Sequence, residues 1–296
     1  MFTRTLLFFA CMAMSCPLWA QDQDLLRDVA PDKTAKTPVG SAFKSSRVIM
    51  SQSIEMLKPG VLDFRILHRF GNVNQGAKEF FGLDQATIRL GFDYGISRNL
   101  TVGIGRGSYR KELDGFVKGK LLQQQLNGSP LSVVLVGGAT LITAPWAVEN
   151  EKYRFGHRMA YFTQLLAGSK FSDAFSLQLM PTYLHRNLVP TATDRNNLFA
   201  AGVGGRLKVS KRSSINFDYY LVAGKPAGRY NPLSLGVDIE TGGHVFQLHL
   251  TNAVGMNERV FLTETTNSWG KGDIQIGFNI SRAFQVGKKR EVKTKW

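Results

Sequence analysis

The sequence is almost free of cysteine. Its two cysteines, Cys11 and Cys16, lie within the first twenty residues, and none follows. Disulfide bonds, thiol nucleophiles and thiolate metal sites are therefore excluded from the rest of the chain. After residue 20 the sequence also lacks any uninterrupted run of about 18 apolar residues, so no transmembrane helix is expected there.

The first twenty residues have the pattern of a secretory signal peptide. Arg4 supplies a positive charge, residues 5–14 form a short apolar stretch, and Ala20 is the small residue at a cleavage site. A lipidated Cys16 is the alternative, but the residues before it fit the lipidation pattern poorly. We expect residues 1–20 to be removed when the protein is exported.

Acidic residues are also scarce. The chain has 22 Asp and Glu against 37 Lys and Arg, which gives a formal net charge of +15. Such a balance favours an anionic partner. Because an exported protein seldom meets nucleic acid, and because the basic residues are spread along the whole chain, we expect lipopolysaccharide or an anionic solute instead. A solvated basic surface is the alternative interpretation.

From residue 61 onward, the hydrophobic pattern has a period of two. Apolar side chains alternate with polar, charged or glycine positions, as in the stretch LSLGVDIE at residues 233–240. This period indicates β-strands, and the segments are about 9–13 residues long, as bilayer-crossing strands require. The sequence predicts twelve strands, at 61–70, 86–96, 99–109, 114–125, 130–142, 157–169, 174–185, 197–209, 213–223, 232–240, 244–252 and 273–284.

The connections between these strands alternate in length. Tight connections fall at 97–98, 126–129, 170–173, 210–212 and 241–243, and long ones at 71–85, 143–156, 186–196, 224–231 and 253–272. Short periplasmic turns and longer outer loops are typical of bacterial outer-membrane barrels. We therefore predict an all-β fold, a single closed antiparallel transmembrane β-barrel of about 12 strands at residues 61–284. Both termini are expected in the periplasm of a Gram-negative cell.

The residues on either side of the barrel do not fit the strand pattern. Residues 48–57 are compatible with a strand or a short helix, yet one added strand would make the strand number odd. We therefore expect residues 21–60 to form a periplasmic or lumenal segment, with a fourteen-stranded barrel as the alternative. Residues 285–296 are expected to form a basic C-terminal tail.

Several stretches of the chain resemble a known bacterial family. The most specific are Asp238–Asn252, DIETGGHVFQLHLTN, and Trp269–Phe284, WGKGDIQIGFNISRAF. Shorter matching stretches are His68–Gly71, Phe81–Asp84, Gly103–Arg106, Leu177–Thr182 and Asn187–Thr191. Over roughly residues 40–284, the sequence resembles an uncharacterised family of bacterial membrane-bound β-barrel domains. The resemblance implies a barrel and, because the family has no assigned activity, implies no function.

The charges expected inside the barrel are the candidate functional residues. If the apolar positions of each strand face lipid, the other positions face the lumen. The resulting set is Arg65, Arg69, Arg89, Lys118, Lys120, Arg206 and Lys208, with the acids Asp63, Asp93, Asp218, Asp238 and Glu240. A wet lumen with an excess of Arg and Lys favours anions. Alternatively, these side chains pair with one another and fill a closed interior.

Two main function classes remain open from the sequence, and a lipid-modifying enzyme of the outer membrane is a third, less favoured one. The first is a diffusion channel or transporter in the outer membrane for small, anionic solutes. The second is a closed structural or partner-binding barrel, whose loops at 71–85, 143–156 and 253–272 would contact a partner or the cell surface. The expected partners are outer-membrane lipid and lipopolysaccharide, the barrel-assembly machinery during biogenesis, and a small anionic solute.

Enzymatic and metal chemistry is not expected. An outer-membrane lipid hydrolase needs a serine within reach of a histidine, and the sequence has no His-x-Ser pair. We therefore assign no catalytic residue. The five histidines form no HxH or HxxxH pair, so neither a metal site nor a cofactor is expected.

Overall fold

The computed structural model describes residues 35–145 and 153–287. The expected signal peptide, most of the expected C-terminal tail and the centre of the 143–156 connection lie outside these ranges. Within the described ranges, the structure contains no helix with the length and apolar character needed to cross a membrane.

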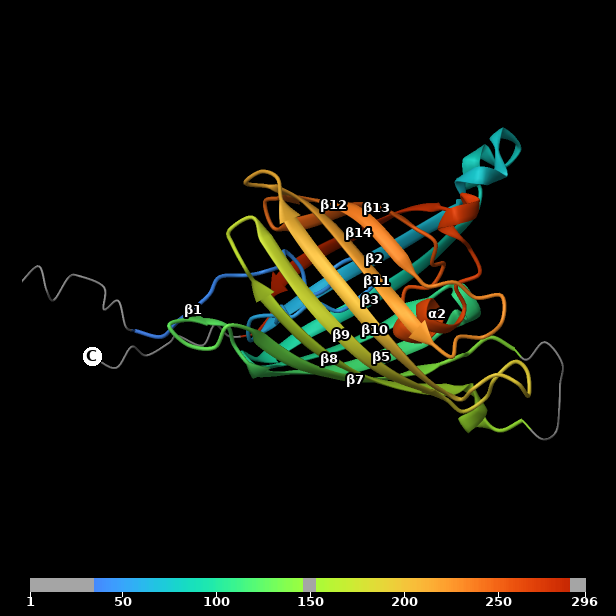
Figure 1. The fold of residues 1–296 in the computed structure, drawn as a ribbon, viewed down its shortest axis with the longest axis horizontal. Helices are drawn as coiled ribbons and strands as arrows, with labels where there is room; N and C mark the ends of the chain where they lie inside the picture. Colours follow the sequence, from blue (N-terminus) through green and yellow to red (C-terminus); the bar gives the residue numbers. More distant parts are fainter. Residues whose placement is uncertain (1–34, 146–152, 288–296) are drawn as a thin grey trace, which may run out of the picture.

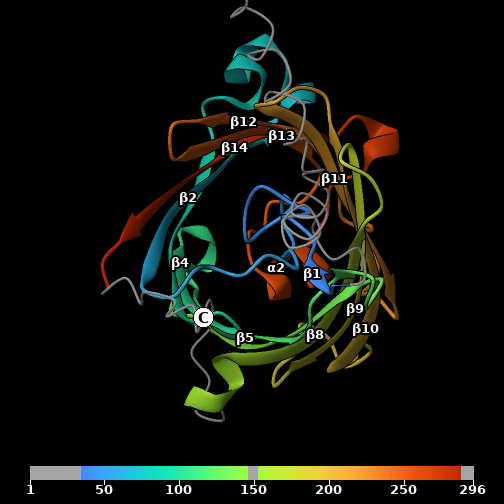
Figure 2. The same ribbon diagram turned by 90° about the vertical axis from the view of Figure 1, so that its left-hand side faces the viewer.

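Twelve antiparallel strands close into one barrel (Figures 1 and 2). They are β2 (Val61–Asn72), β3 (Ala86–Ser97), β4 (Leu100–Gly107), β5 (Leu113–Leu122), β7 (Ser132–Leu141), β8 (Met159–Lys170), β9 (Phe175–Arg186), β10 (Asn197–Lys208), β11 (Ser213–Ala223), β12 (Leu233–Thr241), β13 (His244–Thr251) and β14 (Gln275–Gln285). Each strand pairs with its neighbours in sequence, and β14 closes the sheet against β2, where Ile280 faces Ile66. The prediction of a closed twelve-stranded barrel is confirmed, and the barrel does not have fourteen strands.

The period of two in the sequence sets the two faces of the wall. On β9, Ser176, Gln178 and Met180 are buried, whereas Leu179 between them is exposed. The same outward exposure is found for Phe92, Ile104, Val117, Leu135, Phe199, Leu221 and Leu248. The apolar outer face is what a bilayer requires of a barrel. The inner face is mixed, because polar side chains alternate there with buried apolar ones such as Val134, Phe162 and Leu184.

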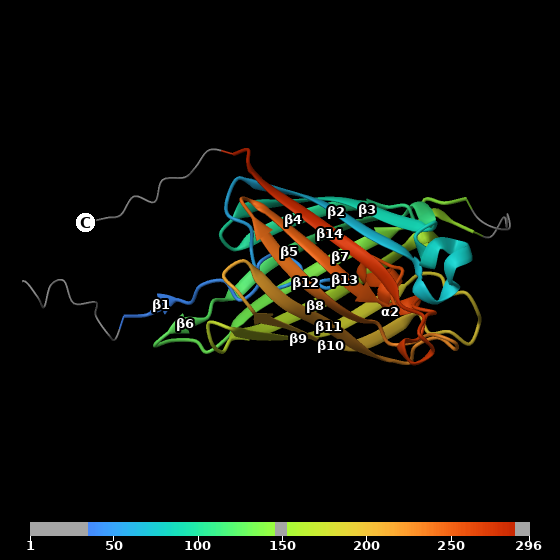
Figure 3. The ribbon, with the colours of Figure 1, turned by 90° about the horizontal axis from the view of Figure 1, so that it is seen from above.

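Most connections are short at one end of the barrel and long at the other (Figure 3); the exceptions are 108–112 at the long-loop end and 123–131, which includes β6, at the short-turn end. At the short-turn end, β1 (Thr37–Pro38) pairs with β6 (Gln125–Leu126) in a separate ribbon. The long connections carry short 3-10 helices, η1 (Val73–Gln75), η2 (Ala77–Gly82), η3 (Tyr109–Lys111), η4 (Phe155–Arg158) and η5 (Trp269–Lys271), and one α-helix, α2 (Glu258–Thr263).

Two segments occupy the barrel interior. Residues 41–57, here called the plug, run inside from the end where β1 lies, and α2 reaches in from the long-loop end (Figures 1 and 2). Apolar side chains of both segments belong to one buried cluster with residues of the wall. Those of the plug are Phe43, Val48, Ile49, Met50 and Ile54, and Phe261 and Leu262 come from α2. The hydrophobic core of this protein is thus inside the barrel.

The expectation that the connection 253–272 lies at the surface is wrong for its first half. All six residues of α2 are buried, and so is Ala253. The cause is an apolar face of α2 that packs against wall residues, as Phe261 does against Tyr220 with ring centroids 5.2 Å apart.

Candidate functional site

The plug folds as a tight hairpin within the lumen. Arg47 and Gln52 pair as an antiparallel bridge, and the backbone N–H of Ser53 donates to the carbonyl of Ser46 at 2.9 Å. This backbone pairing satisfies several polar groups that burial would otherwise leave without partners. The hairpin is therefore a compact unit rather than an extended strand added to the wall.

A carboxylate of the plug ties its entrance to the hairpin. Glu55 Oε1 accepts hydrogen bonds from the backbone N–H groups of Ala42, at 2.7 Å, and Phe43, at 3.1 Å. Ala42 and Phe43 are buried, and Glu55 is half-buried. The plug thus carries one negative charge into the lumen.

The tip of the hairpin surrounds the carboxylate of Asp218 on β11. Asp218 Oδ2 accepts from the backbone N–H groups of Ile49, Met50 and Ser51 at 3.2, 2.9 and 3.0 Å. The hydroxyl of Ser51 donates to the same oxygen at 2.9 Å. Successive N–H groups that converge on one anion form a strong, charge-assisted contact. Asp218 is therefore the main anchor of the tip.

Two lumenal cations hold the carbonyl groups of the plug. Lys118 Nζ donates to the carbonyls of Glu55 at 2.7 Å and Ser46 at 3.2 Å. Arg206 Nη1 donates to the carbonyl of Ala42 at 3.0 Å. Among the described residues, neither cation has an ion pair with a carboxylate. Two plug carbonyls accept from Lys118, whereas one accepts from Arg206, whose Nε has no partner among the described residues.

Three side-chain amides of the wall add contacts to the plug backbone. Gln178 donates to the carbonyl of Gln52 and accepts from the N–H of Ile54, Gln247 donates to the carbonyl of Val48, and Asn279 donates to that of Ile49. The wall thus holds the plug largely through the plug's main chain. Such contacts depend little on which side chains the plug carries.

Other lumenal charges pair within the wall. Arg65 Nε lies 2.9 Å from Asp63 Oδ2 and 3.3 Å from Asp93 Oδ2. Arg89 Nε and Nη2 both contact Asp114, at 2.8 and 2.5 Å. These pairs do not need the plug for their neutralisation. For Arg65 and Arg89, the structure therefore has the ion pairs that were expected if the lumenal charges pair with one another and fill a closed interior.

Arg69 on β2 is the least satisfied cation in the lumen. It is fully buried, and its Nη1 donates to the carbonyl of His68 and to Asn279 Oδ1, both at 3.0 Å. Its Nε and Nη2 have no partner among the described residues, and neither ring nitrogen of buried His249 has one. Gly277 separates the two side chains, because a Cβ there would lie 2.4 Å from His249 Nε2 and 2.9 Å from Arg69 Cδ.

Among the described residues, the other predicted site residues make no hydrogen bond to the plug backbone, although Glu240 contacts a plug side chain. Asp238 accepts from Gln247 at 2.6 Å, and Glu240 pairs with Lys44 ahead of the hairpin. Lys120 is half-buried and donates to Gln123 at 2.6 Å, and Lys208 is exposed. Lys118, Arg206 and Asp218 therefore each bind the plug, at different points along it, and Lys120 and Lys208 do not belong to this group.

The connection that carries α2, residues 252–274, is here called the inserted loop. It is bound to the connection between β4 and β5. Arg259 of α2 contacts Glu112 through Nε at 2.6 Å and Nη2 at 2.5 Å, and contacts Glu264 through Nη1 at 2.5 Å. Glu264 also accepts from the Tyr109 hydroxyl at 2.9 Å and lies 3.0 Å from Arg110 Nε. Burial opposes ionisation of Glu264, but the charges of Arg259 and Arg110 outweigh it and hold its pKa below the usual value. We call these five residues the latch.

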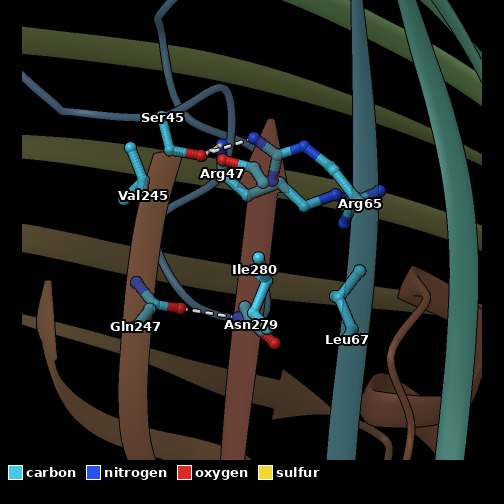
Figure 4. A pocket seen from close by; sticks show the side chains of 9 residues that line it. Ser45, Arg47, Arg65, Leu67, Val245, Gln247, Asn279 and Ile280 are labelled. Carbon is cyan, nitrogen blue, oxygen red and sulfur yellow. Dashed lines mark hydrogen bonds between the residues drawn. The ribbon is translucent and has the colours of Figure 1, made fainter. Parts of the chain in front are cut away.

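The plug and α2 meet at one ion pair. Arg47 Nη1 lies 3.7 Å from Glu258 Oε1, and both side chains are 2% exposed. On the plug side, Arg47, Arg65 and Ser45 line a cavity of about 10 Å³, the space of one water molecule (Figure 4). No solute has room in this cavity, which lies between the plug and the wall.

The sequence predicted a periplasmic or lumenal segment at residues 21–60, and residues 41–57 lie in the lumen; it did not predict which of these residues contact the wall, nor that α2 is buried. A usable signal was present at residues 48–57, where apolar residues occur with serines and without the alternation of a wall strand. Glu112, Glu258 and Arg259 gave no such signal, because they lie in connections where charges are normally solvated.

The structure is similar to several outer-membrane barrels of known structure. The NanC porin has 9% identity and a TM-score of 0.49, with 75% of this chain and 98% of that chain covered. The KdgM porin has 9% identity and a TM-score of 0.46, with 76% and 99% covered. Omp33, an outer membrane protein of Acinetobacter baumannii, has 10% identity and a TM-score of 0.42, with 75% and 97% covered. Similarities at this level transfer no function to this chain.

A family model gives a direct assignment. No curated protein matches the sequence significantly. The model described as "Membrane bound beta barrel domain" (DUF5777) matches residues 43–284, which include the plug hairpin and all twelve strands. The chain therefore belongs to this family of membrane-bound β-barrel domains.

Proposed function

We propose that the protein is a channel for small solutes in the outer membrane, and that the plug and α2 hold it closed in the present state. The observation that carries this proposal is that the plug contributes no strand to the closed twelve-stranded sheet. All wall hydrogen bonds stay in place when the plug leaves, so opening costs only the contacts inside the lumen. A segment can act as a gate only if it can leave the lumen without breaking the wall, and the plug meets this condition.

The charged groups on the inner face of the wall support a lumen that is wet when open. Ionised groups that remain buried are costly, and apolar side chains would fill a permanently closed interior at lower free energy. Departure of the plug uncovers the three cations Lys118, Arg206 and Arg69 and the anion Asp218. An excess of positive charge in a pore favours anions, so we propose a preference for anionic solutes.

The environment of the barrel is part of the proposal. The apolar outer face suits outer-membrane lipid, and the long connections suit contact with lipopolysaccharide at the cell surface. The barrel-assembly machinery would insert the chain after cleavage of its signal peptide. We propose no catalytic role.

Ion conductance across a planar bilayer tests the channel. The full chain is expected to conduct rarely, whereas a variant with residues 41–57 replaced by a Gly–Ser linker of equal length should give frequent, anion-selective steps. Unboiled samples of both proteins should migrate faster in SDS than boiled ones, which controls for folding. A second variant, in which a linker also replaces residues 253–265, covers the case in which α2 alone blocks the lumen.

A closed structural or partner-binding barrel is the second candidate. The burial of both the plug and α2 favours it, since together they leave the lumen occluded. If both linker variants fold and neither conducts, the channel proposal is wrong and this second function takes its place.

A further inference from the structure

We propose that Lys118, Arg206 and Asp218 form the binding site for the solute, a small molecule with a carboxylate or phosphate group, and that the plug occupies this site as an internal mimic. An arriving oxyanion would take the place of the plug's carbonyl oxygens and release the hairpin. This inference rests on the proposed channel and adds its ligand chemistry and its opening mechanism.

The first argument is the kind of partner that the two cations have. Lys118 and Arg206 donate to neutral carbonyls of residues 42, 46 and 55 at 2.7–3.2 Å. These bonds are charge-assisted on the donor side only, and an ionised oxygen in place of a carbonyl adds direct Coulomb attraction between opposite charges. An oxyanion in the same position therefore binds these donors better than the plug does. The plug holds the site with ligands that a solute can outcompete.

The second argument is the division of lumenal charges into two groups. Arg65 and Arg89 have carboxylate partners on neighbouring wall strands, at 2.9 and 2.5 Å. Lys118 and Arg206 have no such partner among the described residues and instead grip the plug. Arg65 and Arg89 thus have carboxylate partners on the wall, whereas the closest oxygen partners of Lys118 and Arg206 are carbonyls of the plug. Cations left without a wall counterion are available to a ligand.

The third argument is Arg69, which has donors left over even in the closed state. It is fully buried, and its Nε and Nη2 lack partners among the described residues. It lies three residues from the long-loop end of β2, whereas Arg206 lies two residues from the short-turn end of β10. A solute entering from the long-loop end would meet Arg69 before it reaches Arg206. The unpaired cations thus extend along the lumen.

Competition between solute and plug follows from mass action. A ligand that binds only when the plug has left the site increases the population of the open state, and a higher affinity for the site gives a larger increase. Asp218 is the complementary element, because it holds N–H groups of the hairpin tip and becomes free to accept from a solute hydroxyl or ammonium group. The preferred solute therefore carries an oxyanion together with hydrogen-bond donors.

The test uses the full chain with a reporter in the plug. The sequence after residue 20 has no cysteine, so Gln52→Cys introduces a unique thiol in the mature protein. Gln52 is fully buried, and its side-chain amide has no partner among the described residues. The rate of maleimide labelling at this position, in detergent-solubilised folded barrel, reports how often the plug leaves.

Succinate and inorganic phosphate, each compared with chloride at equal ionic strength, are the probes. Either oxyanion should raise the labelling rate by about tenfold. This corresponds to a coupling free energy of about 1.4 kcal/mol between oxyanion binding and release of the plug. The two arms separate carboxylate from phosphate recognition. In Lys118→Gln/Arg206→Gln, basal labelling should be fast and independent of oxyanion. Lys208→Gln is the matched control, because Lys208 is an exposed cation on the same strand and face as Arg206 and should leave the response unchanged.

The outcomes separate this inference from the channel proposal. Labelling that ignores both oxyanions, or that still responds to them in the double variant, overturns the site even if the linker variants conduct. Silent linker variants combined with an intact oxyanion response overturn the channel and leave a ligand-binding barrel.

Discussion

At the scale of single residues, the wall uses charge to hold a segment that is not part of it. Asp218 accepts four hydrogen bonds from the tip of the hairpin through one oxygen. A carboxylate is suited to this position because it accepts without donating, and its charge strengthens each bond. The same carboxylate would be expensive to bury alone, so the plug and Asp218 depend on one another.

Replacement of this carboxylate should loosen the plug selectively. In Asp218→Asn the charge is lost and the new N–H₂ group faces N–H donors, so plug docking should weaken by about 2–4 kcal/mol. Maleimide labelling of the Gln52→Cys reporter would then accelerate by at least tenfold. Asp173→Asn, at an exposed turn, is the control and should have no effect. An unchanged labelling rate in Asp218→Asn would show that the anchor lies elsewhere.

At the scale of elements, the inserted loop depends on ionised acids of the latch. Glu264 is held below its ordinary pKa of 4.5 by Arg259 and Arg110 in spite of burial. A carboxyl group with a depressed pKa contributes stability above its unfolded value and loses it as the pH falls through the folded value. The pKa of Glu258 is shifted in the opposite direction, because burial raises it. Protonation of Glu258 therefore favours its buried position. Acid should therefore release the loop through Glu264 and not through Glu258.

The pH dependence of loop exposure tests this assignment. In the variant Leu262→Cys, the thiol replaces a side chain of α2 that is 3% exposed. Its labelling, by a reagent whose rate is corrected for thiol ionisation, should be slow near neutral pH and should rise as the pH falls below about 4.5. Glu264→Gln should label faster at neutral pH and lose most of the acid response. An acid response that persists in Glu264→Gln would assign the switch to another group.

At the scale of the whole molecule, the barrel carries apolar side chains on its outer face and buries its lumenal charges inside. Its outer face carries exposed apolar residues such as Leu179, which is 56% exposed near the middle of β9. Such exposure is unstable in water and stable in lipid. The plug and α2 then supply inside the barrel the apolar core that a soluble domain builds between its layers.

A charge on the outer face should destabilise the barrel by an amount set by its depth. Leu179→Lys places a cation near mid-bilayer and should reduce the free energy of unfolding in liposomes by about 2–4 kcal/mol. Leu179→Phe keeps the apolar character and should change that free energy by less than about 1 kcal/mol. Reversible urea unfolding, followed by tryptophan fluorescence, measures both. Equal stability of the two variants would mean that this position does not face lipid.

Much of the barrel followed from local pattern. The predicted strands at 86–96, 213–223 and 244–252 match β3, β11 and β13 to within a residue at each end. In each of them, apolar residues recur at every second position, and that period alone separates lipid-facing from lumen-facing side chains. The same period assigns Arg65, Arg89 and Asp218 to the lumenal face, and all three are buried there.

By itself, then, the sequence determined the strand number, the connection rhythm and the faces of the wall, because these depend on neighbours within a few residues. Only the tertiary structure decided what fills the lumen. The contacts of Asp218 with Met50 and of Arg259 with Glu112 join residues 168 and 147 positions apart. Whether a buried charge meets a wall partner, a plug carbonyl or water depends on how distant segments pack. No local period records that choice, and for this barrel it is the difference between an open pore and a closed one.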